Sequence, residues 1–181
     1  MPLNLTKIYN QHLELLHLAE YQRTISLKAI FERDIANNEA FLFRTKVIRH
    51  IKKADGQPSM DTIFSHLINQ SSESEKDDNG KIIKKRDNFD IERSKRLHWI
   101  WHHIQEKNTD KIDVFSYLDR IDGKDKIRTY IYDYVEKYVI ILEPQRSGLD
   151  YYLITAYYLT EKLGGVKQVE KKRKRRLDQV Y

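Results

Sequence analysis

Four segments rich in β-branched and aromatic residues lie in succession between Lys111 and Leu159, and they restrict the fold of this chain more than any other feature. Their sequences are KIDVFSYLDR, KIRTYIYDY, YVIILE and DYYLITAYYL, and short runs with glycine, proline or charged residues separate them. This composition favours β-strands, and such short connections favour antiparallel neighbours. The sequence therefore predicts a four-stranded antiparallel meander. The strand that begins at Lys111 is a candidate edge strand that could pair with another chain.

The sequence before the meander has mostly helical spacing. Apolar residues recur three or four positions apart over residues 3–35, over Met60–Asn69 and over Phe89–Glu106, and a short extended segment is expected around Phe41 and Val47. Helices that precede an antiparallel sheet indicate an α+β fold. We therefore expect N-terminal helices packed on one face of a four-stranded antiparallel meander sheet, with a basic C-terminal helix. The other face of the sheet would be open to a ligand.

Three parts of the chain are expected. Residues 1–40 would form an N-terminal helical segment, residues 41–160 the main domain, and residues 161–181 a basic C-terminal helix or tail. Within the main domain, residues 70–88 are nearly all polar or charged, which predicts a mobile loop. It is not a linker between domains, because neither side looks complete alone.

Most of the positive charge lies near the end of the sequence. The formal net charge is +6, and residues 161–181 hold eight Lys or Arg and three Asp or Glu, a net of +5, which leaves +1 for residues 1–160. The run KKRKRR, Lys171–Arg176, would attract nucleic-acid phosphates or an anionic membrane surface. The other interpretation is a charged helix end that simply stays in water.

Several function classes are excluded or disfavoured by the sequence. Cysteine is absent, which rules out disulfides, thiolate nucleophiles and cysteine-ligated zinc and suits a cytoplasmic protein. No apolar run approaches the roughly 20 residues that span a bilayer, and no secretory signal is recognised. There is no glycine-rich phosphate loop and no serine elbow. His98 and His102 have metal-ligand spacing but lack a third ligand, so we expect solvent-facing histidines and no metal.

Alternation along two of the predicted strands places arginine and tyrosine on a common side. Arg128 would lie with Tyr130, Tyr132 and Tyr134, and burying its guanidinium unpaired would be costly, so we expect it on the open face. In the last strand, Tyr151, Leu153, Thr155 and Tyr157 would share one side and Tyr152, Ile154, Ala156 and Tyr158 the other. Both sides carry tyrosine. We place Thr155 and Tyr157 toward a ligand, with Tyr152 and Tyr158 beneath the helices.

Arginine, histidine, tyrosine and threonine around a sheet can cleave RNA without a metal. One group removes the proton of the 2′-hydroxyl, another protonates the leaving 5′-oxygen, and arginine stabilises the charge on phosphorus. Tyrosines can stack on unpaired bases. The alternative is that each of these residues only packs or forms structural hydrogen bonds.

The order of four segments resembles a known family. FLFRTKVIRHIKKADGQPSMDTIFSHL, RSKRLHWIWHHI, RTYIYDYVEKYVIILEP and DYYLITAYYL, followed by a Lys/Arg-rich helix, are similar to the phage-associated Barnase-EndoU-colicin-RelE-like (BECR fold) nuclease domains. The resemblance covers residues from Phe41 to the end of the sequence. Its most specific parts are His66 with Leu67, the spaced Arg93, Arg96 and Trp99, and the two closing strands.

The resemblance implies a metal-independent endoribonuclease of toxin or phage-effector type. It would cut RNA by 2′-hydroxyl attack, leave a 2′,3′-cyclic phosphate and need no cofactor. By the same resemblance His66 would be a general acid or base, Arg96 and Arg128 would hold the phosphate or transition state, and Thr155 and Tyr157 would orient phosphate or share proton transfer. The nucleic-acid-binding residues would be Arg93, Trp99, Tyr130, Lys171, Lys172, Arg173, Lys174, Arg175 and Arg176.

The expected partner is RNA, whether tRNA, mRNA or ribosome-bound RNA, and a toxin would also have an antitoxin or immunity protein. Two other classes stay open. The chain could be a non-catalytic RNA- or protein-binding module of a phage or mobile element, or a membrane-surface or partner-binding protein that uses its basic helix alone.

Overall fold

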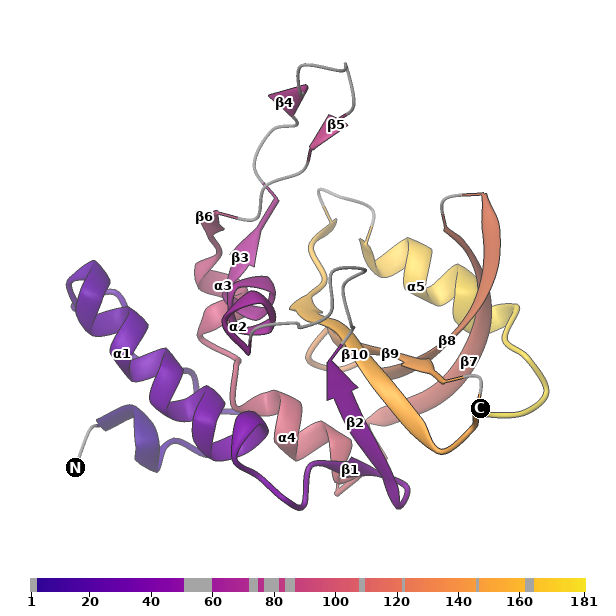
Figure 1. Cartoon of the computed structure of the whole chain (residues 1–181), viewed down its shortest axis with the longest axis horizontal. Helices are drawn as coiled ribbons and strands as arrows, with labels where there is room; N and C mark the ends of the chain where they lie inside the picture. Colours follow the sequence, from indigo (N-terminus) through magenta and orange to yellow (C-terminus); the bar gives the residue numbers. More distant parts are fainter. Residues whose placement is uncertain are drawn as a thin grey trace.

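The computed structural model describes residues 3–50, 60–71, 75–76, 82–83, 87–107, 110–121, 123–145, 147–161 and 165–181. The chain is α+β (Figure 1). The helices are α1 (Glu20–Phe31), α2 (Met60–Ile68), α3 (Ile91–Ser94), α4 (Trp99–Ile104) and α5 (Gly165–Lys174). The strands are β1 (Leu42–Phe43), β2 (Lys46–His50), β3 (Asn69–Gln70), β4 (Glu75–Lys76), β5 (Ile82–Ile83), β6 (Asn88–Phe89), β7 (Ile112–Ile121), β8 (Lys124–Asp133), β9 (Tyr138–Pro144) and β10 (Asp150–Tyr158).

The main sheet has six strands in the order β1-β2-β10-β9-β8-β7, so the predicted four-stranded antiparallel sheet is wrong. Strands β7 to β10 are antiparallel neighbours, but β2 lies beside β10 in parallel and makes the sheet mixed. An ion pair at 2.7 Å joins Arg49 of β2 to Asp150 of β10 across 101 residues of sequence. Local patterns do not encode a pairing between such distant segments.

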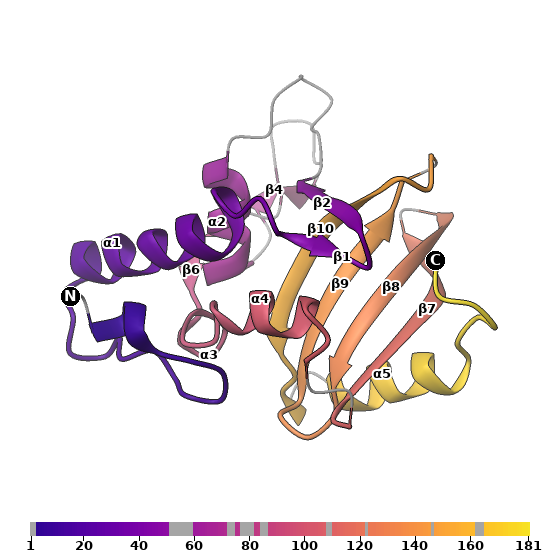
Figure 2. The same cartoon turned by 90° about the horizontal axis from the view of Figure 1, so that it is seen from below.

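Helices cover both faces of this sheet. The larger core includes Ile131, Ile140 and Leu142 of the sheet together with buried residues of α1, α2 and α4. A second core on the opposite face contains Phe115, Tyr132 and Val139, against which Val169 of α5 packs. We call these sides the helical face and the α5 face. The second face was expected to be open, but α5 covers part of it (Figure 2).

A β-bulge divides β10. Its pairing with β9 passes from Leu153↔Leu142 to Thr155↔Ile141, so Ile154 has no residue opposite it. A bulge of one residue reverses the side toward which the following side chains point. Leu153 therefore lies on the helical face and Thr155 on the α5 face, although strict alternation placed them together.

The bulge also changes the positions of the strand's tyrosines. Tyr157 packs with the core on the α5 face, and Tyr158 packs with the core on the helical face. Tyr152 is paired with Glu143, whose carboxylate binds Lys126 and Arg128 of the α5 face. Tyr152 was expected beneath the helices and lies on the other side instead.

The helical sequence from Phe89 to Glu106 forms two short helices rather than one. Asp90 caps α3, since its Oδ1 accepts a hydrogen bond from the main-chain nitrogen of Arg93 at 3.0 Å. A turn over residues 95–98 then redirects the chain into α4. α4 lies across the helical face of the sheet (Figure 2).

Residues 3–40 pack into the same core as the sheet. Leu13 and Leu15 come from an irregular segment that follows a 3-10 turn over Leu3–Thr6, and Leu27 and Ile30 come from α1. α1 continues into a π-helical turn over Glu32–Ala36. The N-terminal segment therefore completes the core of the helical face.

Described parts of residues 69–89 form two small antiparallel ribbons. β3 pairs with β6 through Asn69↔Phe89, and β4 pairs with β5 through Glu75↔Ile83. From the first pair to the second, one partner moves forward from residue 69 to 75 and the other moves back from residue 89 to 83. Each partner moves by six residues, so the two ribbons have the same pairing register. The predicted mobile loop at 70–88 thus contains paired strands, and its residues 72–74, 77–81 and 84–86 lie outside the described residues.

The segment after α5 crosses the outer edge of β7. The main-chain nitrogen of Leu177 donates to the main-chain oxygen of Ser116 at 2.8 Å, and that of Tyr181 donates to Ser116 Oγ at 3.0 Å. The main-chain oxygen of Tyr181 accepts hydrogen bonds from Thr129 Oγ1 at 2.8 Å and Tyr151 OH at 2.5 Å. The chain thus passes from the α5 face to the helical face around β7.

Candidate functional site

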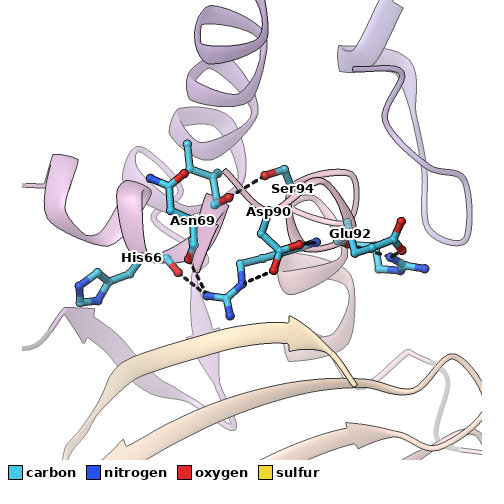
Figure 3. A network of polar contacts seen from close by, with 8 residues as sticks. His66, Asn69, Asp90, Glu92 and Ser94 are labelled. Atoms are coloured by element: carbon cyan, nitrogen blue, oxygen red, sulfur yellow. Dashed lines mark hydrogen bonds and ion pairs between the residues drawn. The ribbon is translucent and has the colours of Figure 1, made fainter. Parts of the chain in front are cut away.

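The guanidinium of Arg93 is held between two helices. Its Nη1 donates to the main-chain oxygens of His66 at 2.7 Å and Asn69 at 3.1 Å, at the C-terminal end of α2 (Figure 3). The α3 cap Asp90 places its Oδ2 3.8 Å from Arg93 Nε. Carbonyls at a helix end lack partners within the helix and carry partial negative charge. They therefore fix this cation in place.

Arg93 meets the sheet at the edge of β10. Its guanidinium carbon lies 5.5 Å from the centre of the Tyr157 ring, a distance that allows a cation–π interaction. The parallel pairing of β2 with β10 ends at Leu153 among the described residues. α2 and α3 also contact β10, and α3 carries Arg93 to the part of β10 that follows Leu153.

Arg128 lies on the α5 face, as its alternation with Tyr130 and Tyr132 predicted. Its side chain is 19% exposed, and its Nε is 3.7 Å from Glu143 Oε2, which is an ion pair but longer than a hydrogen bond. This buried Nε has no hydrogen-bond partner among the described residues. Tyr117, which is paired with Arg128, and Tyr157 both pack against the cluster that contains Tyr130.

Thr155 carries a hydroxyl where packing alone would favour valine. Its Oγ1 is buried and has no hydrogen-bond partner within the described parts of the chain. Such an oxygen costs roughly 1–3 kcal/mol relative to a bonded one, and most buried polar groups are bonded. We call Arg93, Arg128, Thr155 and Tyr157 the β10 site.

Tyr130 and Lys172 were both expected to bind RNA, but they bind each other. Tyr130 is buried and donates to Asp119 Oδ2, and Lys172 Nζ donates to Tyr130 OH at 2.7 Å and lies 2.6 Å from Asp119 Oδ1. Burial, together with the hydrogen bond to Asp119, raises the pKa of Tyr130. The phenol therefore stays protonated and anchors α5 to the sheet instead of stacking on a base.

Trp99 and Arg96 are also in the interior. Trp99 is fully buried, and its Nε1 donates to the main-chain oxygen of Gln11 at 3.0 Å. Arg96 lies over the rings of Trp99 at 5.2 Å and Tyr158 at 4.2 Å, and its Nη1 is 2.9 Å from Glu92 Oε2. Tyr158 packs on the helical face and Thr155 on the other, so the sheet separates Arg96 from the β10 site.

His66 contributes its main-chain oxygen to this site. Its carbonyl oxygen binds Arg93, while its imidazole extends away from that guanidinium (Figure 3). The expected role of His66 in proton transfer therefore receives no support from the position of its ring.

His98 and His102 were expected to face solvent, but His98, just before α4, is buried and His102 of α4 is half-buried. His98 is 5% exposed, and its Nε2 lies 3.2 Å from the main-chain oxygen of Ile8. Burial lowers the pKa of His98 to about 4. Among the described residues, no group of three or more His, Asp or Glu could hold a metal ion.

A buried network around Asp133 was missed by sequence reasoning. Its Oδ2 is 3.0 Å from His103 Nε2 and accepts a hydrogen bond from Tyr9 OH at 2.7 Å. His103 Nδ1 lies 2.7 Å from the main-chain oxygen of Trp99, so both ring nitrogens face an oxygen atom. Burial alone would raise the pKa of Asp133. Its hydrogen bonds with His103, Glu136 and Tyr9 together outweigh burial, so the pKa of Asp133 is lowered. The sequence signal was a carboxylate directly after the β-branched and aromatic run TYIY, Thr129–Tyr132.

The β10 site combines predicted site residues with two buried groups, Thr155 Oγ1 and Arg128 Nε, that have no hydrogen-bond partner among the described residues. The chain matches no family model, no curated protein and no solved structure. The site is therefore interpreted from its own geometry. No helix in the described part of the chain has the length and apolar character to cross a bilayer.

Proposed function

We propose that the chain is a metal-independent endoribonuclease that cuts RNA at the β10 site. The observation that carries the proposal is the buried, unpartnered hydroxyl of Thr155 on the same sheet face as Arg128. A phosphate oxygen would accept a hydrogen bond from this hydroxyl and from Arg128 Nε, and so would satisfy two groups at once. Arginine suits this role because its fork of donors matches phosphate geometry.

Arg93 and Tyr157 complete the polar groups of this site. The guanidinium is already oriented by the α2 carbonyls, so binding a phosphate would require little further ordering. A cation fixed before the reaction stabilises charge that develops on phosphorus without reorganisation. The Tyr157 ring beneath it offers a phenol for proton transfer and an aromatic face for a base.

The proposed reaction is an internal transesterification. The 2′-oxygen forms a bond to phosphorus, the bond from phosphorus to the 5′-oxygen breaks, and the products are a 2′,3′-cyclic phosphate and a 5′-hydroxyl. A base takes the proton of the 2′-hydroxyl and an acid returns one to the 5′-oxygen, so no oxidant or co-reactant is consumed. Tyr157 is our candidate for one of these transfers.

Cleavage of total tRNA, mRNA and ribosomes, with and without EDTA, tests the proposal. We expect products ending in a cyclic phosphate in both conditions. Arg128→Ala and Thr155→Val should each reduce the cleavage rate by about 10²-fold or more, as loss of one transition-state donor does. Arg120→Ala is the matched control, because Arg120 is exposed on the neighbouring strand. Unchanged cleavage in both site variants would refute the site.

A non-catalytic RNA-binding module is the second candidate, and the direction of the His66 ring favours it, since the imidazole is turned away from Arg93 (Figure 3). In that case the RNA stays full length in every condition. Binding would still weaken in Arg128→Ala because a phosphate contact is lost.

A further inference from the structure

We propose that the outward side of α5 binds the phosphates of single-stranded RNA outside the β10 site. This inference rests on the proposed function, because it describes how a longer RNA is held beside the place where it is cut. The surface consists of Lys167, Lys171, Lys174 and Arg175, which we call the α5 stripe.

The structure divides the basic run of α5 into two sets. Lys172 Nζ lies 2.6 Å from Asp119 Oδ1, and Arg173 Nε lies 2.5 Å from Asp113 Oδ2. Arg176 Nη1 reaches the same Asp113 oxygen at 3.2 Å. Carboxylates of β7 therefore neutralise three of the six cations of the run Lys171–Arg176. These three anchor the helix.

The α5 stripe has no such partners. Lys167, Lys171 and Lys174 follow one another at spacings of four and three, which puts them on one side of the helix, and Arg175 lies four positions after Lys171. All four are exposed. Within the described part of the chain, none of them makes an ion pair or a hydrogen bond through its side chain. Together with Glu170 they line one surface depression, in which four cations face one carboxylate. From Lys167 to Arg175 the stripe is about 12 Å long, given the rise of an α-helix.

The stripe flanks the β10 site. Val166 of α5 and Tyr157 of β10 pack against the same cluster, which contains Leu159 and Val169. An RNA strand with one phosphate at Thr155 could therefore continue along the outer side of α5. We commit to a single strand because the aromatic ring of Tyr157 beside Arg93 can stack on an unpaired base.

An anionic membrane is a poorer fit to the same charges. Helices that lie in a membrane interface bury an apolar face of Trp, Phe or Leu. The apolar residues of α5 that could do this, Val166 and Val169, are turned toward the sheet. Lysine contacts to phosphate need no apolar face, and they position a strand without reading its bases.

Salt-dependent RNA binding by the full chain tests the stripe. The probe is an oligouridylate of about 20 nucleotides, longer than the roughly 4–16 that one single-strand-binding fold covers. It carries 2′-O-methyl groups, so it cannot be cut. The variant is Lys167→Gln/Lys171→Gln/Lys174→Gln. Its control is Lys28→Gln/Lys107→Gln/Lys124→Gln, which removes the same charge from exposed sites elsewhere.

We expect the stripe variant to lose about 2 units from the slope of log affinity against log salt, since each phosphate contact to a single strand contributes about 0.7. The control should keep the slope and should cleave a dinucleotide at the parental rate. Equal slopes in the stripe variant and its control would overturn the inference. So would a stripe variant that no longer binds phosphatidylserine vesicles but still binds RNA like the parent chain. If the slope falls but no RNA is ever cut, the stripe stands and the ribonuclease proposal fails.

Discussion

At the scale of single residues, His98 links stability to pH. The pKa of His98 is lowered from 6.5 to about 4 because the ring is buried. The unfolded chain therefore binds more protons between these values, and the free energy of unfolding decreases as pH falls from 6.5 toward 4. His98→Gln keeps a nitrogen donor for the Ile8 oxygen but does not titrate. It should remove about 3 kcal/mol of this pH dependence.

Urea unfolding at several pH values between 4 and 7 measures the effect. His17→Gln is the control, because His17 is exposed. Parallel pH profiles for His98→Gln and the parent chain would show that His98 is not the group responsible.

Asp133 provides a second prediction at this scale. Asp133→Asn leaves the buried His103 ring without its carboxylate and places an amide among donors from Tyr9 and the main chain. Leaving buried hydrogen-bond donors without their acceptor costs about 1–3 kcal/mol, which urea unfolding at neutral pH should detect. Asp125→Asn, on the same strand but exposed, should change stability by less than about 0.5 kcal/mol. If Asp133→Asn lost no more stability than Asp125→Asn, the hydrogen bonds of Asp133 would not stabilise the fold as described.

Residue types alone could not sort the predicted site residues. Arg93 lies over the ring of Tyr157, and Arg128 and Thr155 share the α5 face with that ring, whereas Trp99 and Tyr130 are core residues. An amphipathic ring serves equally in a core or on a ligand, because its polar atom needs a partner in either place. Only the three-dimensional arrangement shows that Trp99 bonds to Gln11 and that Tyr130 bonds to Asp119.

At the scale of elements, Lys172 determines how firmly α5 is attached. Lys172→Met keeps the aliphatic packing but leaves Asp119 and Tyr130 without their cation. We expect α5 to open more readily by about 1–3 kcal/mol, since a largely buried carboxylate loses its partner. Hydrogen exchange of the α5 amides should then accelerate, while that of β8 and β9 stays unchanged. Lys171→Met, one position away and exposed, should leave α5 exchange as it is.

Strand positions were predictable, but their arrangement was not. The four segments from Lys111 to Leu159 correspond closely to β7, β8, β9 and β10, because alternation and β-branched residues are local signals. The parallel partner β2 and the bulge at Ile154 depend on contacts between distant segments. The bulge alone moved Thr155 away from Leu153. This is why face assignments by strict alternation failed in the last strand.

At the scale of the whole molecule, residues 1–40 are needed for folding of the remainder. Leu13, Leu15, Leu27, Ile30 and Phe31 are buried in the core of the helical face. At about 1.5–3 kcal/mol for each buried side chain, they supply as much as the usual net stability of about 5–15 kcal/mol. We expect the fragment 41–181 to lack cooperative unfolding by circular dichroism. Adding a peptide of residues 1–40 should restore it, and a fragment that unfolds like the full chain would contradict this packing.

The outer edge of β7 has a consequence for behaviour in solution. An exposed strand edge is a template for another chain, and this edge is occupied in part by Leu177 and Tyr181, which bind Ser116. The same segment is continuous with α5, so loosening the helix would also uncover the strand. Self-association should therefore increase with any change that frees α5, and Lys172→Met should make the protein more prone to concentration-dependent aggregation than its stability alone would suggest.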